Sequence, residues 1–285
     1  MSAQSAGHYF VPQPSHWPIT GSIALLFLAF GMVTLLHVGS GPGYALIAMG
    51  FAVLIYMLFG WFGTVARESE AGNYNAQVDM SFRWSMGWFI FSEVMFFAAF
   101  FGALFYARNI SVPWLGDIDN KLLWPNFNAA WPTNGPLPYE SHALEKVSAW
   151  GIPAINTLIL LTSGWTVTMA HWAIKKNNRG GLNFWLFVTI CLGLLFLGLQ
   201  AYEYGHAYAD GVTLKQGVYG ATFYMLTGFH GFHVTVGTIM LMVILGRCLA
   251  GHFKPEYHFG FEAVAWYWHF VDVVWLLLFI LVYWL

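Results

Sequence analysis

The sequence predicts an all-α integral membrane protein with seven transmembrane helices. Of its 285 residues, 58% are hydrophobic and only 8% are charged, whereas soluble domains carry about 25% charged residues. Seven apolar runs are each long enough to cross the hydrocarbon core of a bilayer, which takes about 20 helical residues. These runs lack the polar and apolar alternation of an outer-membrane strand. Helices are therefore the structure that satisfies their backbone groups in lipid.

The expected helices follow one another along the chain. They span residues 19–36, 44–66, 84–106, 152–174, 184–204, 219–245 and 264–284. Prolines at positions 12, 14 and 18 interrupt any helix before the first run. The segment of about 108–151 carries many turn formers and is long for a bundle loop. We expect it on the outer surface, either docked on a neighbouring subunit or covering helix ends. Without a fixed-period repeat, residues 1–285 are predicted to form a single membrane domain.

Composition and motifs exclude several functions. The formal net charge of -2 gives no basic surface for nucleic acid. No nucleophile with an adjacent base, phosphate-binding glycine loop or dinucleotide fingerprint is present, so no catalytic residue is predicted. Cys191 and Cys248 lie in different settings and are interpreted as packing residues. The N-terminus lacks the pattern of a cleaved signal peptide.

The distribution of lysine and arginine predicts the orientation of the chain. The N-terminal side of the membrane holds seven of these residues: Arg67, Arg83, Lys175, Lys176, Arg179, Arg247 and Lys254. The opposite side holds four: Arg108, Lys121, Lys146 and Lys215. Because short cytoplasmic loops carry an excess of positive charge, we expect the N-terminus in the cytoplasm and the C-terminus outside.

Glu93 is an acid inside an apolar and aromatic run. It lies roughly 14 Å into the third expected helix, at about 1.5 Å per residue. A charged carboxylate near the bilayer centre costs about 2.5–3.5 kcal/mol, which favours the protonated carboxyl. Two interpretations follow, namely a proton-linked or lipid-contacting carboxyl and a buried acid that hydrogen-bonds to a neighbouring helix.

Histidines in the sixth and seventh expected helices could bind a metal or hydrogen-bond between helices. His230 and His233 are three residues apart and face similar directions. A haem-copper centre needs further histidines at a common depth, so we expect no metal site and favour interhelical hydrogen bonds. In the last helix, Glu262, His269 and Asp272 lie within an arc of roughly 80°. They could form a proton relay with Glu93 in a proton-coupled carrier, or a polar seam that joins this helix to its neighbours.

The inner ends of two helices carry groups suited to phospholipid headgroups. Trp61 is followed by Arg67 and Glu68 at the end of the second helix. An interfacial aromatic anchors a helix at headgroup level, and a guanidinium binds a phosphate through two hydrogen bonds. The alternative is an ordinary interfacial anchor. Arg247, with His252 and Lys254, forms a similar patch.

Several segments together resemble subunit III of the haem-copper cytochrome c oxidases of the aa3 type. They are HWPITG (16–21), Trp61 with ARES (66–69), SEVMFF (92–97), QAYE (200–203), GVYGATF (217–223), TGFHGFH (227–233), HFGFEA (258–263) and WYWHFVDVVW (266–275). They extend over the whole chain. Two departures stand at Asn73-Tyr74, where many members of the family have histidines, and at Ala250, where a lysine is common.

The resemblance implies a non-catalytic core subunit of a proton-pumping cytochrome c oxidase, which reduces oxygen to water. It implies two bundles, helices 1–2 (residues 17–66) and helices 3–7 (residues 84–285), around a V-shaped, lipid-filled cleft. The implied main partner is subunit I, which holds the haems and copper, with subunit II and other oxidase subunits also present. The chain itself is expected to bind phospholipid and no redox cofactor, and to support sustained turnover and proton uptake.

The resemblance also assigns residues to groups. Lipid or cleft contacts are implied for Trp61, Arg67, Glu68, Glu93 and Arg247, and the polar seam contains His230, His233, Glu262, His269 and Asp272. Subunit III of a quinol oxidase is the alternative within the family, although that subunit typically lacks the first two helices. The long segment 108–151 favours a bacterial inner membrane over a mitochondrial one.

Overall fold

The computed structural model describes residues 10–136, 146–215 and 217–285. These residues form helices and no strands, and seven of the helices are long and apolar enough to cross a membrane. The prediction of an all-α, seven-helix membrane fold is therefore confirmed. The long helices are α1 (Trp17–His37), α2 (Ser40–Glu70), α3 (Ala76–Tyr106), α6 (Ile152–Lys175), α7 (Arg179–Ala209), α8 (Gly217–Leu249) and α9 (Phe259–Leu278).

The helices extend beyond their apolar runs, because a helix that leaves the hydrocarbon can continue with polar residues. The largest difference concerns α3, which does not end before Arg108. It continues through a π-helical turn, Ala107–Ser111, into α4, Val112–Leu115. The predicted start of the outer loop at residue 108 is therefore wrong. The short helix α5 (Ile118–Lys121) follows, with Asp117 as its N-cap. Residues 137–145 of the predicted loop lie outside the described residues.

The chain divides into two compact units, and the boundary lies between Phe82 and Arg83 inside α3. In the first unit, α1 and α2 pack against each other through glycine. A Cβ atom on Gly43 would meet the backbone of Leu35, and one on Gly31 would lie 2.8 Å from the backbone nitrogen of Ile47. Small residues let membrane helices approach closely and gain van der Waals contact, so the glycines hold this pair together.

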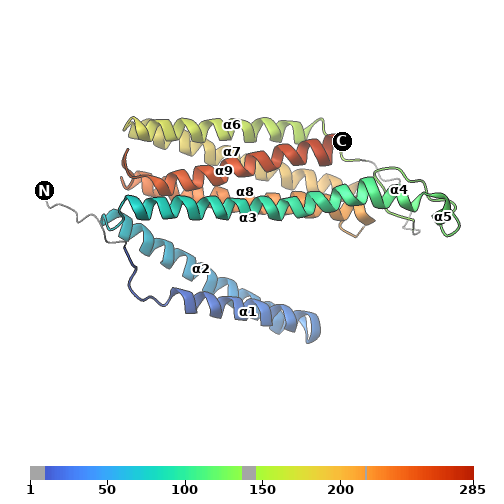
Figure 1. Cartoon of the computed structure of the whole chain (residues 1–285), viewed down its shortest axis with the longest axis horizontal. Coiled ribbons are helices and arrows are strands. Elements are labelled where there is room, and N and C mark those ends of the chain that lie inside the picture. Colours follow the sequence, from blue (N-terminus) through green and yellow to red (C-terminus); the bar gives the residue numbers. More distant parts are fainter. Residues whose placement is uncertain (1–9, 137–145, 216) are drawn as a thin grey trace. The chain divides into compact units, whose positions relative to one another are not determined.

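The second unit is a helical bundle in which α6 to α9 run along a common direction (Figure 1). α6 packs against α7 and α9, and α8 packs against the same two helices. α3 joins this arrangement through aromatic contacts, since Phe97 lies beside Phe270 of α9 and Phe96 beside Phe229 of α8.

The core of the second unit is built around α9. Over half of its membrane-length stretch is buried, 56% compared with 11% for α1 and α2. The indole nitrogens of Trp268 and Trp275 donate hydrogen bonds of 2.9 Å to Ser163 and Thr157 of α6. Because a buried indole N–H usually finds a partner, these bonds fix the position of α9 against α6. Gly237 of α8 lies against the Trp268 ring, where a Cβ atom would be only 3.0 Å away.

The described part of the outer segment packs on helix ends. Trp131 contacts the ring of Tyr219 at the start of α8, and the Tyr219 hydroxyl accepts a hydrogen bond from the Val147 backbone. Of the two alternatives for this segment, these contacts correspond to the covering of helix ends. Beyond α9, a π-helical turn spans Phe279–Trp284.

Two basic side chains hold the C-terminal end of that turn. Lys146 donates a hydrogen bond of 2.8 Å to the carbonyl oxygen of Trp284, and Arg108 donates one of 2.6 Å to that of Leu285. Cations favour the negative end of a helix dipole and satisfy its free carbonyl groups. Burial, and secondarily the charge of Arg108, lowers the pKa of Lys146.

Candidate functional site

Glu93 of α3 pairs with His233 of α8. The carboxylate oxygen Oε2 lies 2.9 Å from Nε2 of the imidazole, and the two side chains are 23% and 8% exposed. Phe97 and Tyr267 lie against the imidazole ring. Two residues that the sequence assigned to separate groups, the lipid cleft and the polar seam, thus form one interhelical pair.

The geometry of this pair fixes how many protons it holds. Nδ1 of His233 lies 2.6 Å from the carbonyl oxygen of Phe229, which can only accept, so Nδ1 carries a proton. The hydrogen bond between Nε2 and the Glu93 carboxyl then needs one further proton, on either partner. In both cases the pair has no net charge, which makes it compatible with a position inside an apolar bundle.

Glu262 lies at the start of α9 and is surrounded by basic groups from three helices. The guanidinium of Arg83 in α3 donates to Oε2. Oε1 lies 3.3 Å from Nε2 of His171 in α6 and 3.1 Å from Nε2 of His258, the N-cap of α9. Only 11% of the Glu262 side chain is exposed. The cluster Arg83, His171, His258 and Glu262 therefore ties α3, α6 and α9 together.

Asp272 and His269 form a separate cluster on α9. Asp272 is about 15 Å from Glu262 along the helix axis, at about 1.5 Å per residue. Its Oδ2 lies 3.4 Å from Nδ1 of His269, whose Nε2 is 3.3 Å from the Thr168 hydroxyl of α6. Gly164 of α6 leaves the space that the Asp272 carboxylate fills. The predicted stripe is thus two clusters, and the relay of a proton-coupled carrier is interrupted between them.

His230 differs from its expected role. It is 1% exposed, and neither ring nitrogen has a hydrogen-bond partner among the described residues. Its ring instead packs between Phe196 and Trp275. The expectation of an interhelical hydrogen bond is wrong within the described structure, because aromatic side chains from α7 and α9 enclose the imidazole.

In the first unit, the end of α2 presents an aromatic and a cationic side chain. Trp61 is exposed and stacked on Phe62, with ring centroids 6.0 Å apart. Arg67 is exposed and donates one hydrogen bond of 3.0 Å to Thr64. Further guanidinium donors therefore remain for an anionic group from outside the unit.

Glu68 turns toward the segment between α2 and α3. The hydroxyl of Tyr74 donates a hydrogen bond of 2.7 Å to Oε2 of Glu68. Burial, followed by this hydrogen bond to Glu68, raises the pKa of Tyr74. Tyr74 is one of the departures noted in the sequence from the resembled family, and here its hydroxyl donates to the acid that was expected at a headgroup. Arg247, on α8, lies over the ring of Phe253 at 4.4 Å from its centroid.

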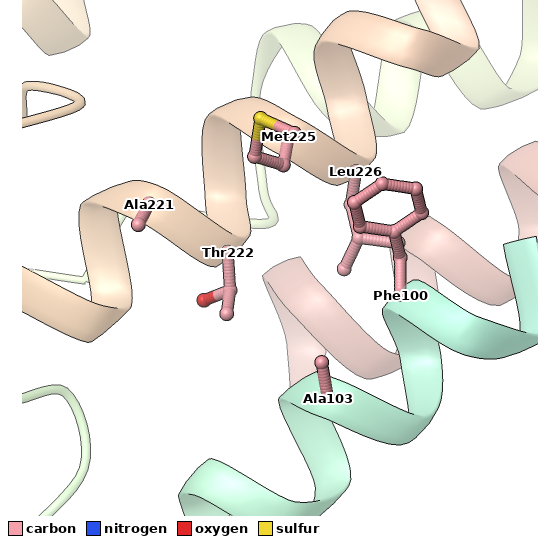
Figure 2. A pocket seen from close by; sticks show the side chains of 6 residues that line it. All are labelled: Phe100, Ala103, Ala221, Thr222, Met225 and Leu226. Carbon is pink, nitrogen blue, oxygen red and sulfur yellow. The ribbon is translucent and has the colours of Figure 1, made fainter.

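An apolar pocket of about 190 Å³ lies between α3 and α8 (Figure 2). Its lining is Phe100, Ala103, Ala221, Thr222, Met225 and Leu226. The Thr222 hydroxyl donates a hydrogen bond to the carbonyl oxygen of Val218. The side chain of Thr222 therefore contributes its methyl group, and no free hydroxyl, to the pocket wall. Phe100 lies seven residues after Glu93 and therefore on the same face of α3, about 10 Å farther along the helix.

Sequence reasoning missed His171 and His258 as members of a cluster. His258 and Glu262 are four residues apart, a spacing that places both on one helix face, and that signal was available. His171 comes from another helix, and no local pattern predicts its approach.

Seven membrane-length helices, with acid and histidine pairs inside the bundle, define a polytopic membrane protein. Comparison with known families is more specific, since a family model described as cytochrome c oxidase subunit III matches residues 7–285. The chain belongs to this family.

Curated relatives named cytochrome c oxidase subunit 3 cover nearly the whole chain. The relative from Marchantia polymorpha is 41% identical over 285 residues, which is 100% of this chain and 98% of the relative. The relative from Arabidopsis thaliana is 41% identical over 277 residues, 97% of this chain and 96% of the relative. The relative from Canis lupus familiaris is 40% identical over the same extent.

Proposed function

We propose that this chain is a non-catalytic core subunit of a proton-pumping cytochrome c oxidase. The observation that carries the proposal is the family match over residues 7–285. The histidines of α8 support the absence of a redox centre, because His233 is engaged with Glu93 and Phe229. His230 is enclosed by aromatic rings. Haem and copper then belong to partner subunits, as does the transfer of electrons from cytochrome c to oxygen.

The main partner in this proposal is subunit I, which holds the haems and copper, with subunit II and other oxidase subunits in the same complex. Support comes from the apolar surface of the helices. In α1, α2 and α3 only 11% of the membrane-length stretch is buried within the chain. An extensive apolar surface is unfavourable in water. Lipid or the apolar helices of another subunit must therefore cover it.

Bound phospholipid is the second part of the proposal. Arg67 and Trp61 are suited to a headgroup, because a guanidinium binds phosphate bidentately and an aromatic ring lies at headgroup level. The apolar pocket at Phe100 is suited to an acyl chain (Figure 2). We further propose that lipid occupies the cleft implied by the family, and that the chain lies in a bacterial inner membrane.

Removal of the chain tests the function. In oxidase purified from a strain that lacks this gene, we expect unchanged haem and copper spectra and an unchanged initial rate with cytochrome c. During sustained turnover, activity should decay faster than in the intact complex. A haem or copper absorption band in the isolated, lipid-supplemented chain would overturn the proposal, as would equal decay in the two complexes. A quinol that replaces cytochrome c as the electron donor would identify the quinol oxidase instead.

Glu93 is the proposed proton-linked residue, and two substitutions separate this role from a structural one. In Glu93→Gln, the amide can still donate a hydrogen bond to Nε2 of His233, but it cannot exchange a proton at neutral pH. In Glu93→Leu, the hydrogen bond is lost as well. We expect Glu93→Gln to slow proton uptake and hasten the loss of activity while thermal stability is retained. Wild-type kinetics in Glu93→Gln, with defects only in Glu93→Leu, would reduce Glu93 to a structural residue.

A further inference from the structure

We propose that His171, His258 and Glu262 form a binding site for a divalent transition-metal ion, with zinc as the best fit. The site lies in the second unit, where α6 ends and α9 begins. It departs from the expectation that the chain holds no metal, and it concerns residues for which the proposed function gives no role.

The three potential ligand atoms form a nearly equilateral triangle. The Nε2 atoms of His171 and His258 are 3.2 Å apart. Oε1 of Glu262 lies 3.3 Å from the first and 3.1 Å from the second. In a tetrahedral zinc site with bonds of about 2.0–2.1 Å, two ligand atoms are about 3.3 Å apart. The triangle therefore has the size of one face of a zinc tetrahedron, and the fourth position is left for water.

Hydrogen bonds among the three potential ligand atoms leave some of these atoms without a donor. Nδ1 of His258 lies 3.1 Å from the carbonyl oxygen of Lys254, which can only accept, so a neutral His258 carries its proton there. Its Nε2 is then an acceptor, like the oxygen of Glu262. A neutral His171 can supply one N–H, which leaves Nε2 of His258 and Oε1 of Glu262 as facing acceptors. A metal ion would bind all three lone pairs; protonation of His258 is the alternative.

The surroundings orient the ligands as in known metal sites. Metal-bound histidines almost always donate their other ring N–H to a carbonyl or carboxylate, and His258 has this arrangement with Lys254. Arg83 holds the second oxygen of Glu262, so that Oε1 faces the histidines. Both contacts fix ligand direction before an ion arrives.

The ligand set selects the class of ion. Two imidazoles and one carboxylate suit zinc, copper, nickel and ferrous iron, whereas magnesium and calcium prefer oxygen ligands. A hydrated ion can reach the site, because the His171 side chain is 22% exposed and lies one turn before the end of α6. The nearby charges of Arg83 and Lys175 oppose a divalent cation, so we infer reversible binding that links α6 to α9.

Metal content of the intact complex tests the proposal. The complex is purified through a tag on this chain, stripped with a chelator and dialysed against zinc, and bound zinc is measured by elemental analysis. We expect His171→Asn and His258→Asn each to lose one bound zinc relative to the wild type. His269→Asn is the matched control, because His269 also faces an acid on α9, and among the described residues it belongs to no group of three potential ligands; it should retain that zinc.

Two measurements on the wild type do not depend on how the variants fold. Zinc should protect His171 and His258 from carbethoxylation, read by mass spectrometry, whereas magnesium should not. X-ray absorption at the zinc edge should show two imidazoles in the first shell. Equal zinc content in all folded variants, or labelling of both histidines unaffected by zinc, would overturn the proposal and leave a protonated His258 as the explanation.

Discussion

Tyr74 links the end of α2 to the start of α3 through its hydroxyl and its ring. Its hydrogen bond to Glu68 is 2.7 Å long, and Phe10 and Phe82 lie edge-on to its ring. The hydroxyl also lies 3.4 Å from the carbonyl oxygen of Val65, so polar and aromatic contacts of Tyr74 together hold the short connection between two membrane helices. At this scale, the hydroxyl of one residue, Tyr74, gives Glu68 an internal partner, although Glu68 was expected at a headgroup.

The raised pKa of Tyr74 predicts a loss of stability in alkali. The folded protein binds the phenolic proton more tightly than the unfolded chain, in which tyrosine has a pKa of about 10. The contribution of Tyr74 is therefore complete below pH of about 10 and is lost as the pH rises toward the folded-state pKa.

Tyr74→Phe should cost about 1 kcal/mol at neutral pH, the size of one hydrogen bond, and the difference from the wild type should shrink above pH of about 10. Thermal unfolding of the complex as a function of pH measures both effects. Tyr44→Phe is the control, because Tyr44 is exposed at the start of α2. An equal alkaline loss in wild type and Tyr74→Phe would contradict the assignment.

Two kinds of helix pairing occur at the scale of elements. α1 and α2 approach through glycines, with Gly31 and Gly43 against backbone atoms of the opposite helix. α6 and α9 instead interlock through large side chains, since Trp268 and Trp275 of α9 donate to hydroxyl groups of α6. Lipid gives no hydrophobic driving force between helices. Close backbone contact and hydrogen bonds are therefore the forces that hold each pair.

Two glycines in the first turn of α2, Gly41 and Gly43, provide a matched test of this packing. Gly43→Ala would place a methyl group against the backbone of Leu35, whereas a Cβ on Gly41 meets open space. We expect Gly43→Ala to destabilise the α1–α2 pair by about 1–3 kcal/mol through overpacking, and Gly41→Ala to be neutral. Thermal unfolding of the two variants measures the difference. Equal stability of the two variants would show that α1 and α2 can move apart at Gly43 without loss of stability.

At the scale of the whole molecule, many large apolar side chains of the described residues are exposed on the surface. Trp88, Phe59 and Phe187 are all more than half exposed. Isolated apolar residues on a surface need no explanation, but extensive apolar faces mark contact with lipid or another protein. Seven membrane-length helices and family membership account for this surface.

The positive-inside rule predicts the direction of insertion. Cys191 and Cys248 are first replaced by alanine, and a single cysteine is then placed at position 176 in place of Lys176. This cysteine should react with an impermeant maleimide only when the reagent can reach the cytoplasmic face of the membrane. A cysteine at Leu122, exposed in the segment after α5, should react in intact cells once the outer membrane is permeabilised. The reverse pattern would invert the orientation.

The fold was more predictable than the site. The helix number followed from apolar length, a local property, and Glu93 stood out because a carboxyl inside hydrocarbon is costly. The extension of α3 past Arg108 was missed, because polar residues end an apolar run without ending a helix. Within the described parts of the chain His230 has no hydrogen-bond partner, and this was missed because its neighbours, Phe196 and Trp275, come from other helices.

The sequence by itself determined that this chain is a seven-helix membrane protein with subunit III motifs, since both are written in consecutive residues. Only the tertiary structure decided which polar groups meet. Glu93 and His233 are 140 positions apart, and Arg83 and Glu262 are 179 apart. Such pairs depend on how whole helices pack and at what depth, which the periodicity of any one helix does not contain. The triangle of His171, His258 and Glu262 arises for the same reason.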